Sequence, residues 1–235
     1  MALAFAGFPA AAQSSTLASA EVMTDYRVRG LSWSDGETTA QAYVGLPISS
    51  RLDASITATA LRESSRHGGS DVGVDLAAYY GDRAGLFDWY GGVVGHLFAG
   101  AEGSMDYAEV RAGGSVTLGP AAVDVSASYA PSQDAIGGSN LYGRIGAQAG
   151  IWGSPITFRG HVGRSTGSVD DPVRANRLRP GGDYTDWLLG ADYVLGPFLF
   201  GLAYTDTDID ASEAVPAGLG RDAGSRIVAR ARFDF

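Results

Sequence analysis

The chain has 235 residues, a formal net charge of −9, a mean hydropathy of only +0.01 and no cysteine. The missing cysteine excludes structural disulfides and thiolate metal sites, and the acidic balance argues against nucleic acid as a partner, because binding it depends on clustered Lys and Arg. No stretch approaches the roughly 20 apolar residues of a membrane helix. A membrane β-barrel remains possible, because its lipid-facing apolar residues alternate with polar ones along each strand.

The N-terminus resembles the end of a secretory signal. A short apolar run in residues 1–8 is followed by Pro9, and Ala10, Ala11 and Ala12 supply the small residues of a cleavage site. We therefore expect residues 1–12 to be the remains of a signal peptide and residues 13–235 to form the mature domain. An alanine-rich tail without a signal function is the alternative.

Turn residues divide the rest of the chain into twelve segments in which apolar and polar residues alternate with a period of two. An even number of strands suits a bacterial single-chain barrel with both termini in the periplasm. We therefore expect one all-β domain, a closed antiparallel transmembrane β-barrel of twelve strands in an up-and-down meander. The predicted strands cover residues 16–33, 38–49, 52–63, 71–82, 86–100, 105–118, 121–132, 141–151, 155–165, 184–195, 198–208 and 223–235.

The connections between these segments alternate in length. Those after every second strand are tight, such as 119–120 and 196–197, whereas 166–183 and 207–222 are long. Outer-membrane barrels have short periplasmic turns and longer extracellular loops. The pattern predicts a barrel in the outer membrane of a Gram-negative bacterium, surrounded by outer-membrane lipid and lipopolysaccharide, with its termini in the periplasm.

One face of most predicted strands is continuously apolar and is expected to contact lipid, as with Val123, Val125 and Tyr129. A soluble, lipocalin-like barrel is the alternative, but its outside would be charged. Aromatic residues collect near strand ends, where their rings suit the lipid–water boundary. The predicted rim residues are Trp89, Tyr193, Phe198 and Phe233 on the periplasmic side and Trp33, Phe98, Tyr129, Trp187 and Tyr204 on the outer side.

The last strand ends on a phenylalanine. Ile227 and Phe233 fall on its apolar face together with Phe235, whereas Arg230 and Arg232 fall on the opposite face. A terminal aromatic strand is the usual ending of outer-membrane barrels. We expect Phe235 to lie at the periplasmic rim, where the barrel-assembly machinery recognises it.

Three motifs carry a family resemblance. They are TDYRVRGLSWSDG at residues 24–36, YTDWLLG at residues 184–190 and GLAYTDTD at residues 201–208. In their residues, order and spacing these motifs resemble those of the TorF family of outer-membrane porins. The resemblance supports an outer-membrane barrel. We expect a porin-like channel for passive diffusion of small polar solutes or ions, with no cofactor and no metal.

The inward positions predict the chemistry of the lumen. Arginines on the first and last strands would form one basic wall, because closing a barrel places these strands side by side. Carboxylates on the fourth to seventh strands would face this wall, and opposed charges orient polar solutes while leaving little net ion preference. The predicted pore-lining residues are Arg27, Arg29, Asp75, Asp88, His96, Glu109, Arg111, Asp124, Arg144, Arg159, His161, Asp186, Arg226, Arg230 and Arg232.

Two other functions stay open. A twelve-strand barrel is narrow, so the charged side chains could pair and plug it, leaving a structural barrel that displays loops to a partner. A lipid hydrolase needs a serine within hydrogen-bond reach of a histidine. His67 is expected in an exposed loop, and His96 and His161 have no serine at a matching lumen position on their own strands, so we expect no enzyme.

Two loops carry notable charge. Asp206, Asp208 and Asp210 are spaced as in a calcium loop but lack the glycine and the distal glutamate of an EF-hand. We expect Asp208 and Asp210 at an extracellular loop entrance, bridged to lipopolysaccharide by divalent ions. The long loop around residues 170–182 could fold in as a constriction, bind a partner or stay solvated.

Overall fold

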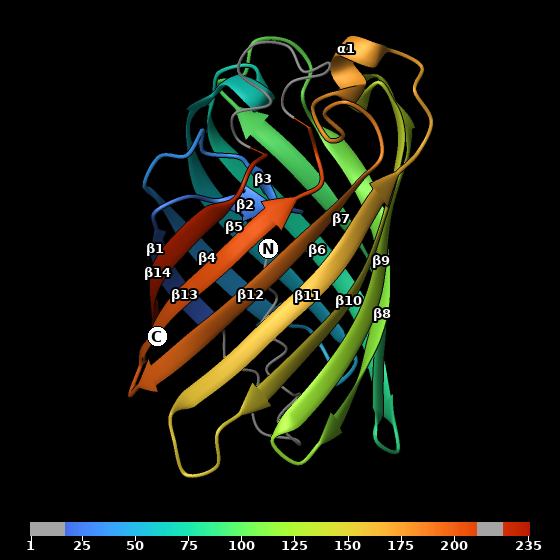
Figure 1. Ribbon diagram of the computed structural model, residues 1–235. Coiled ribbons are helices and arrows are strands. Elements are labelled where there is room, and N and C mark those ends of the chain that lie inside the picture. The colour runs from blue at the N-terminus through green and yellow to red at the C-terminus, as the bar shows by residue number, and fades with distance from the viewer. Residues whose placement is uncertain (1–16, 211–222) are drawn as a thin grey trace.

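The computed structural model describes residues 17–210 and 223–235, in which twelve strands close into one antiparallel barrel (Figure 1). The strands pair in chain order, and β1 also pairs with β14 to close the ring. The predicted twelve-strand barrel is therefore confirmed, whereas the predicted signal segment lies outside the described residues. The barrel strands are β1 (Leu17–Met23), β4 (Thr39–Pro47), β5 (Leu52–Ser64), β6 (Ser70–Ala84), β7 (Phe87–Ala99), β8 (Tyr107–Leu118), β9 (Ala121–Gln133), β10 (Gly138–Gly150), β11 (Ile156–Thr166), β12 (Tyr184–Leu195), β13 (Phe198–Thr207) and β14 (Arg226–Asp234).

The two ends of the barrel differ in the length of their connections, as predicted. At one end, which we name the turn end, strands are joined by short turns such as 85–86 and 119–120. The other end, named the loop end, carries the longer connections and three short helical turns (Figure 1): η1 (Ser65–His67), η2 (Asp134–Ile136) and α1 (Pro172–Ala175). Among the described residues no helix has the length and apolar character needed to cross a membrane.

Large apolar side chains point out of the barrel, as expected for a surface in contact with lipid. The predicted rim residues Trp89, Tyr129, Tyr193, Phe198 and Tyr204 are exposed on this outer surface. The prediction is wrong for Trp33 and Phe98, which are only 3% and 8% exposed and lie in an apolar cluster inside the barrel.

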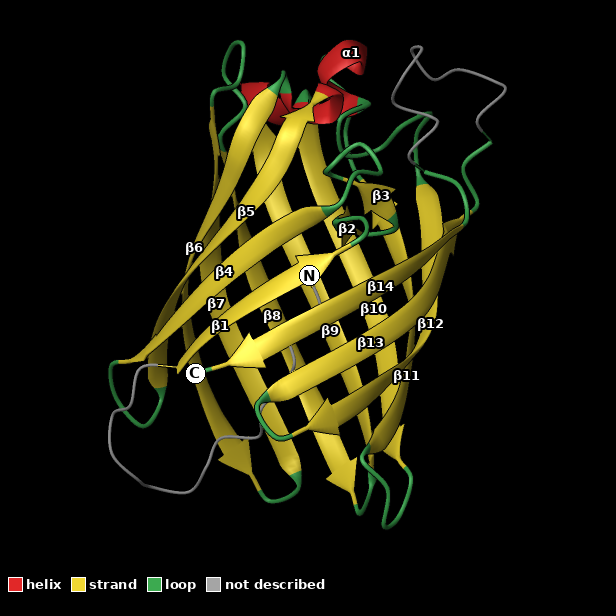
Figure 2. Ribbon diagram, turned by 90° about the vertical axis from the view of Figure 1, so that its left-hand side faces the viewer, coloured by secondary structure: helices red, strands yellow, loops and turns green. Residues whose placement is uncertain are grey.

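The predicted first strand, residues 16–33, is wrong in its second half. β1 ends at Met23, and the chain then turns into the barrel as a hairpin before β4 begins (Figure 2). Its short strands β2 (Arg27–Val28) and β3 (Leu31–Ser32) pair with each other and form a sheet separate from the barrel wall. Arg29 and Gly30 connect them with φ values of 54° and 76°, as a two-residue hairpin turn of type I′ requires. We name residues 24–38 the inner hairpin.

The inner hairpin gives the loop-end half of the barrel an apolar interior. Leu31 and Trp33 pack there with Leu61 and Tyr107, and all four are almost completely buried. The half near the turn end keeps a polar lining. The barrel thus has a packed section at the loop end and an open section toward the turn end, and the hairpin lies at the boundary between them.

Candidate functional site

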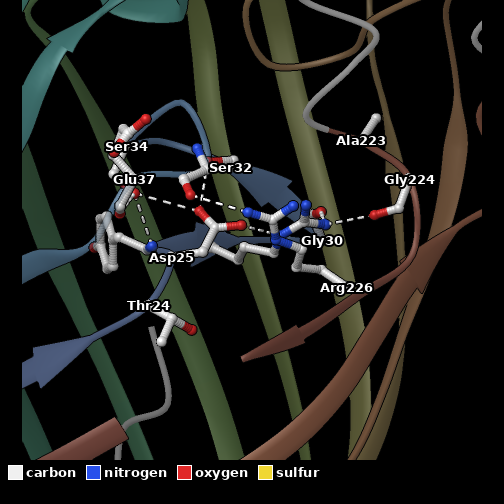
Figure 3. Close-up of polar contacts among 12 residues, drawn as sticks. Thr24, Asp25, Gly30, Ser32, Ser34, Glu37, Ala223, Gly224 and Arg226 are labelled. Atoms are coloured by element: carbon white, nitrogen blue, oxygen red, sulfur yellow. Dashed lines mark hydrogen bonds and ion pairs between the residues drawn. The ribbon is translucent and has the colours of Figure 1, made fainter. Parts of the chain in front are cut away.

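Asp25 holds the inner hairpin in shape. Its carboxylate is 1% exposed and accepts hydrogen bonds from Arg27 Nε at 2.6 Å and from the hydroxyls of Ser32 and Ser34 at 2.5 and 3.3 Å (Figure 3). Ser34 Oγ also accepts the Tyr26 N–H at 2.9 Å. The hairpin is therefore organised by side chains around one buried carboxylate.

Two arginines link the inner hairpin to β14 and to the residues just before it. Arg27 Nη1 donates to the Gly30 carbonyl at 2.9 Å and to the Gly224 carbonyl at 2.7 Å (Figure 3). Arg226 Nη2 donates to the Gly36 carbonyl at 3.0 Å. Both arginines were predicted to line the pore. Arg27 lies on the hairpin and not on a wall strand, and Arg226 bonds the hairpin backbone.

The tip of the inner hairpin crosses the lumen. Arg29 Nη2 lies 2.6 Å from Glu109 Oε2 on β8, and its guanidinium lies 4.7 Å from the centre of the Tyr142 ring on β10. The Tyr184 hydroxyl on β12 donates to the Arg29 carbonyl at 2.9 Å. β8 and β10 are each five positions from β1 around the ring, so the tip reaches the opposite wall.

Glu109 is the centre of the network on that opposite wall. Its side chain has no exposed surface and pairs with both Arg29 and Arg111. His96 Nε2 lies 3.5 Å from the same carboxylate, and His96 Nδ1 lies 2.6 Å from Asp75 Oδ1. Four predicted residues thus meet around the hairpin tip. The predicted continuous basic wall is wrong, because Arg29 leaves β1's side of the barrel and pairs directly with a carboxylate opposite.

A second group lies on β11, β12, β14 and β1, where the predicted Arg159 and Arg230 meet two carboxylates that were not predicted, Asp192 and Glu21. Asp192 accepts from Arg159 Nε at 2.9 Å and from Arg230 Nη2 at 2.9 Å, and Arg230 Nη1 lies 3.5 Å from Glu21. The remaining predicted charges form separate pairs. These are Arg144 with Asp124 at 3.4 Å, His161 with Asp186 at 3.0 Å, Arg83 with Asp88 at 2.6 Å and Arg232 with Asp234 at 2.9 Å.

A cavity of about 500 Å³ is lined by members of both groups, and we name it the chamber. Asp25, Arg27 and Arg29 of the inner hairpin form part of its lining, and it extends to Asp88 and Thr117 near the turn end. Seven arginines and five carboxylates line it. The chamber is therefore a polar space inside the barrel that begins near the turn end and reaches the hairpin.

Buried arginines join the loops above the inner hairpin. Arg66 Nε donates to the Ser32 carbonyl at 3.0 Å, and its Nη1 donates to the Arg177 carbonyl at 2.9 Å. Arg177 Nε donates to His67 Nδ1 at 3.0 Å, and its guanidinium lies 4.3 Å from the Phe98 ring centre. The long loop after β11, left open by the sequence, therefore packs onto the loop end.

His67 is fully buried, so the prediction that it is exposed is wrong. Its ring lies 4.4 Å from that of Trp33 and stacks at 4.5 Å on Phe98. Burial, followed by the charges of Arg177 and Arg66, holds the pKa of His67 well below its usual range. Nothing in the sequence near His67 signals this, because Arg177 is 110 residues away along the chain.

The histidines bear directly on the possibility of a hydrolase. Within residues 17–210 and 223–235, His67 is bonded to Arg177, His96 to Asp75 and His161 to Asp186, and none is bonded to a serine. In the same residues no group of three or more His, Asp or Glu side chains is arranged to hold a metal ion.

Comparison with solved structures finds outer-membrane proteins of similar fold. The chain is similar to the KdgM porin with a TM-score of 0.54 at 10% identity, covering 94% of this chain and 99% of that one. It also matches OmpT, an outer-membrane protein of Vibrio cholerae, with a TM-score of 0.47 at 10% identity, covering 94% of this chain and 97% of that one. An anion-selective porin from Comamonas acidovorans matches with a TM-score of 0.45 at 17% identity, covering 86% and 64%.

The likeness to the KdgM porin at this low identity shows a shared fold, that of an outer-membrane barrel. No curated protein matches the sequence closely enough to count as a relative. The TorF resemblance stays a prediction. A family model described as "bacterial protein of unknown function (Gcw_chp)" matches residues 9–228, and the chain belongs to this family.

Proposed function

We propose that this protein is a porin-like channel for the passive diffusion of small polar solutes or ions, with the inner hairpin as its constriction. The chamber is the observation that carries this proposal, because a polar space of about 500 Å³ leads from the turn end to the hairpin. The apolar outer surface and the porin fold support a location in the outer membrane. In the proposed orientation the turn end and both termini face the periplasm.

The way the inner hairpin is held suits a movable constriction. β2 and β3 pair with each other and add no strand to the barrel wall. At the tip, Arg29 forms an ion pair with Glu109 and stacks on Tyr142 on the opposite wall, and its carbonyl accepts a hydrogen bond from Tyr184 on β12. A movement of the tip away from β8 and β10 breaks no backbone pairing between barrel strands, although Leu31 and Trp33 also hold the hairpin in the apolar cluster.

Conductance in planar bilayers tests the proposal. The wild-type protein should give small or infrequent openings, and Arg29→Ala should raise the conductance or the open probability by removing the ion pair at the tip. Arg51→Ala is the matched control, because Arg51 pairs with Asp82 at the turn end, where its side chain is 55% exposed. This control should conduct like the wild type.

A second variant makes the test decisive. Replacing residues 24–38 with a short Gly/Ser linker keeps all twelve barrel strands and should raise the conductance well above that of the wild type. If this variant folds but neither it, Arg29→Ala nor the wild type conducts, the channel proposal is wrong. The protein would then be a structural barrel that displays loops, a function favoured by the buried arginines that join its loop end.

A further inference from the structure

The arginines on β10 and β11 use only part of their hydrogen-bonding capacity. Arg159 donates through Nε to Asp192 at 2.9 Å, and Arg144 Nη2 lies 3.4 Å from Asp124. Arg159 Nη1 and Nη2 and Arg144 Nη1 bond no other group in the described residues, and none of the three is among the buried unpaired atoms. Since both side chains line the chamber, these N–H groups face its open space.

The countercharge available to these arginines is shared. Asp192 accepts one hydrogen bond from Arg159 and two from Arg230, at 2.9 and 3.0 Å. Glu21 lies 3.5 Å from Arg230 Nη1 and forms no ion pair with Arg159 within 4 Å. Arg144 has only a long contact with Asp124, and its buried Nε has no partner. Neither guanidinium is fully satisfied by the protein.

The strand register brings the two arginines to one stretch of wall. On the β10–β11 ladder Arg144 is opposite Gly163 and Arg159 is opposite Gln148, with His161 and Gly146 forming the pair between them. A Cβ atom at Gly146 would lie 2.7 Å from Arg144 Nη2, so the glycine leaves the space that this guanidinium occupies. The ladder positions of the two arginines are roughly 13 Å apart, at about 3.3 Å per residue.

We propose that Arg144 and Arg159 form a binding site for the oxyanion group of a small organic solute. Guanidinium groups bind carboxylate and phosphate oxygens through paired N–H donors. All 17 cationic residues of the chain are arginine, and seven of them line the chamber although the chain carries a net charge of −9. This site deepens the proposed function by naming the solute class, and it rests on that function for transport but not for binding.

Isothermal titration calorimetry on the full chain folded in detergent micelles tests the site. The probes are succinate for a carboxylate, inorganic phosphate for a phosphate and glucose as a neutral solute of similar size. Wild type should bind at least one of the two anions and not glucose. Binding of only one anion supports the site and identifies its oxyanion, whereas binding of neither overturns the proposal.

Substitutions of the two arginines test whether they form the binding site. Arg144→Gln with Arg159→Gln should weaken anion binding about tenfold or more, as expected for the loss of charge-assisted hydrogen bonds. Arg159→Lys keeps the charge without the paired donors, and its anion affinity should lie between those of the wild type and Arg159→Gln. Arg51→Gln at the turn end should bind like the wild type. Unchanged binding in a folded double variant, judged by its heat-modifiable band, overturns the site.

These experiments test the proposed channel and the proposed oxyanion site independently. A barrel that binds the anion but never conducts would overturn the proposed channel and keep the oxyanion site. A barrel that conducts while the anions show no binding would overturn the site and keep the channel.

Discussion

Glu109 shows how much depends on single buried charges in this lumen. One carboxylate without exposed surface neutralises Arg29 of the inner hairpin and Arg111 of β8, and it also lies beside His96. A buried ion pair gains little net stability, but removing one partner leaves an uncompensated charge away from water. The hairpin is therefore held in place by a group whose loss the barrel interior tolerates poorly.

We predict that Glu109→Gln destabilises the folded barrel by about 3–5 kcal/mol, because two buried guanidinium groups lose their shared countercharge. Urea unfolding in detergent micelles measures this change. Asp88→Asn is the control, because Asp88 pairs with Arg83, whose side chain is 56% exposed, and exposed pairs contribute less than about 1 kcal/mol. Equal stability of the two variants would contradict the role given to Glu109.

His67 should make the loop end sensitive to acid. Its pKa in the folded state lies well below its usual range, because burial and then the charges of Arg177 and Arg66 disfavour the imidazolium. In the unfolded chain the pKa of a histidine is about 6.5. Between that pH and the lower folded value only the unfolded chain takes up the proton. Stability is thus complete above about pH 6.5 and falls as the pH drops below it.

This predicts that the melting temperature falls more steeply between pH 7.5 and pH 5.5 in the wild type than in His67→Asn. Asparagine keeps an acceptor for Arg177 Nε but does not titrate, and His96 and His161 are present in both proteins. The comparison uses the difference in pH dependence, since the variant also loses the stacking on Phe98. Parallel pH profiles would show that His67 does not cause the sensitivity.

Among the elements, the inner hairpin leaves little steric room at its tip. Gly30 at its tip has a φ of 76°, and a Cβ atom there would lie 2.5 Å from Thr207 Cγ2 and 2.9 Å from Asp186 Cβ. Glycine therefore serves two purposes at this position. It adopts the left-handed backbone of the turn, and it lets the tip approach β12 and β13 closely.

Gly30→Ala should therefore destabilise the barrel more than Gly85→Ala. Gly85 also has a positive φ, of 66°, but a Cβ atom there would meet nothing within 4 Å, so its substitution costs only the backbone strain of about 1–2 kcal/mol. Gly30→Ala adds a steric clash that moves the tip away from the wall. Thermal unfolding measures the stability of both variants. The planar-bilayer assay should show larger conductance for Gly30→Ala and unchanged conductance for Gly85→Ala.

The elements also show what the sequence could and could not predict. Strands such as β9 were predictable, because lipid on one side and lumen on the other impose a strict period of two. The inner hairpin was missed because residues 24–29 continue that alternation past Met23. Two signals were available: an eighteen-residue strand exceeds the 9–11 residues that cross a membrane, and Leu31 and Trp33 lie out of phase with Tyr26 and Val28.

The inward direction of many charges followed from the same alternation, as for Glu109 and Arg159. The partners of these charges could not be predicted from the alternation. Pairing depends on which strands face each other across the ring and on what fills the lumen. Arg29 meets Glu109 across 80 residues of sequence, and Arg66 meets Arg177 across 111. Such contacts leave no periodic pattern, so local spacing could not reveal the network that closes the loop end.

At the scale of the whole molecule, β14 closes the barrel against β1, and the chain ends at the turn end. The Phe235 N–H donates to the Ala18 carbonyl at 2.9 Å. The Phe235 ring is 77% exposed and packs edge-on against Phe233 at 4.8 Å, and Phe233 in turn lies 5.1 Å from Phe198. The last ring is thus presented outward beside an aromatic patch at the end proposed to face the periplasm.

We propose that the assembly machinery of the outer membrane recognises this exposed ring, which adds little to the folded barrel itself. Phe235→Ala keeps the backbone hydrogen bond to Ala18 and should refold in detergent with nearly normal yield and stability. In cells the same variant should give much less heat-modifiable barrel in the outer membrane.

Leu195→Ala is the control, because Leu195 is also an outward apolar residue at the turn end. Equal losses for Phe235→Ala in cells and in detergent would mean that the ring stabilises the barrel. Normal membrane yield would mean that the machinery does not recognise it.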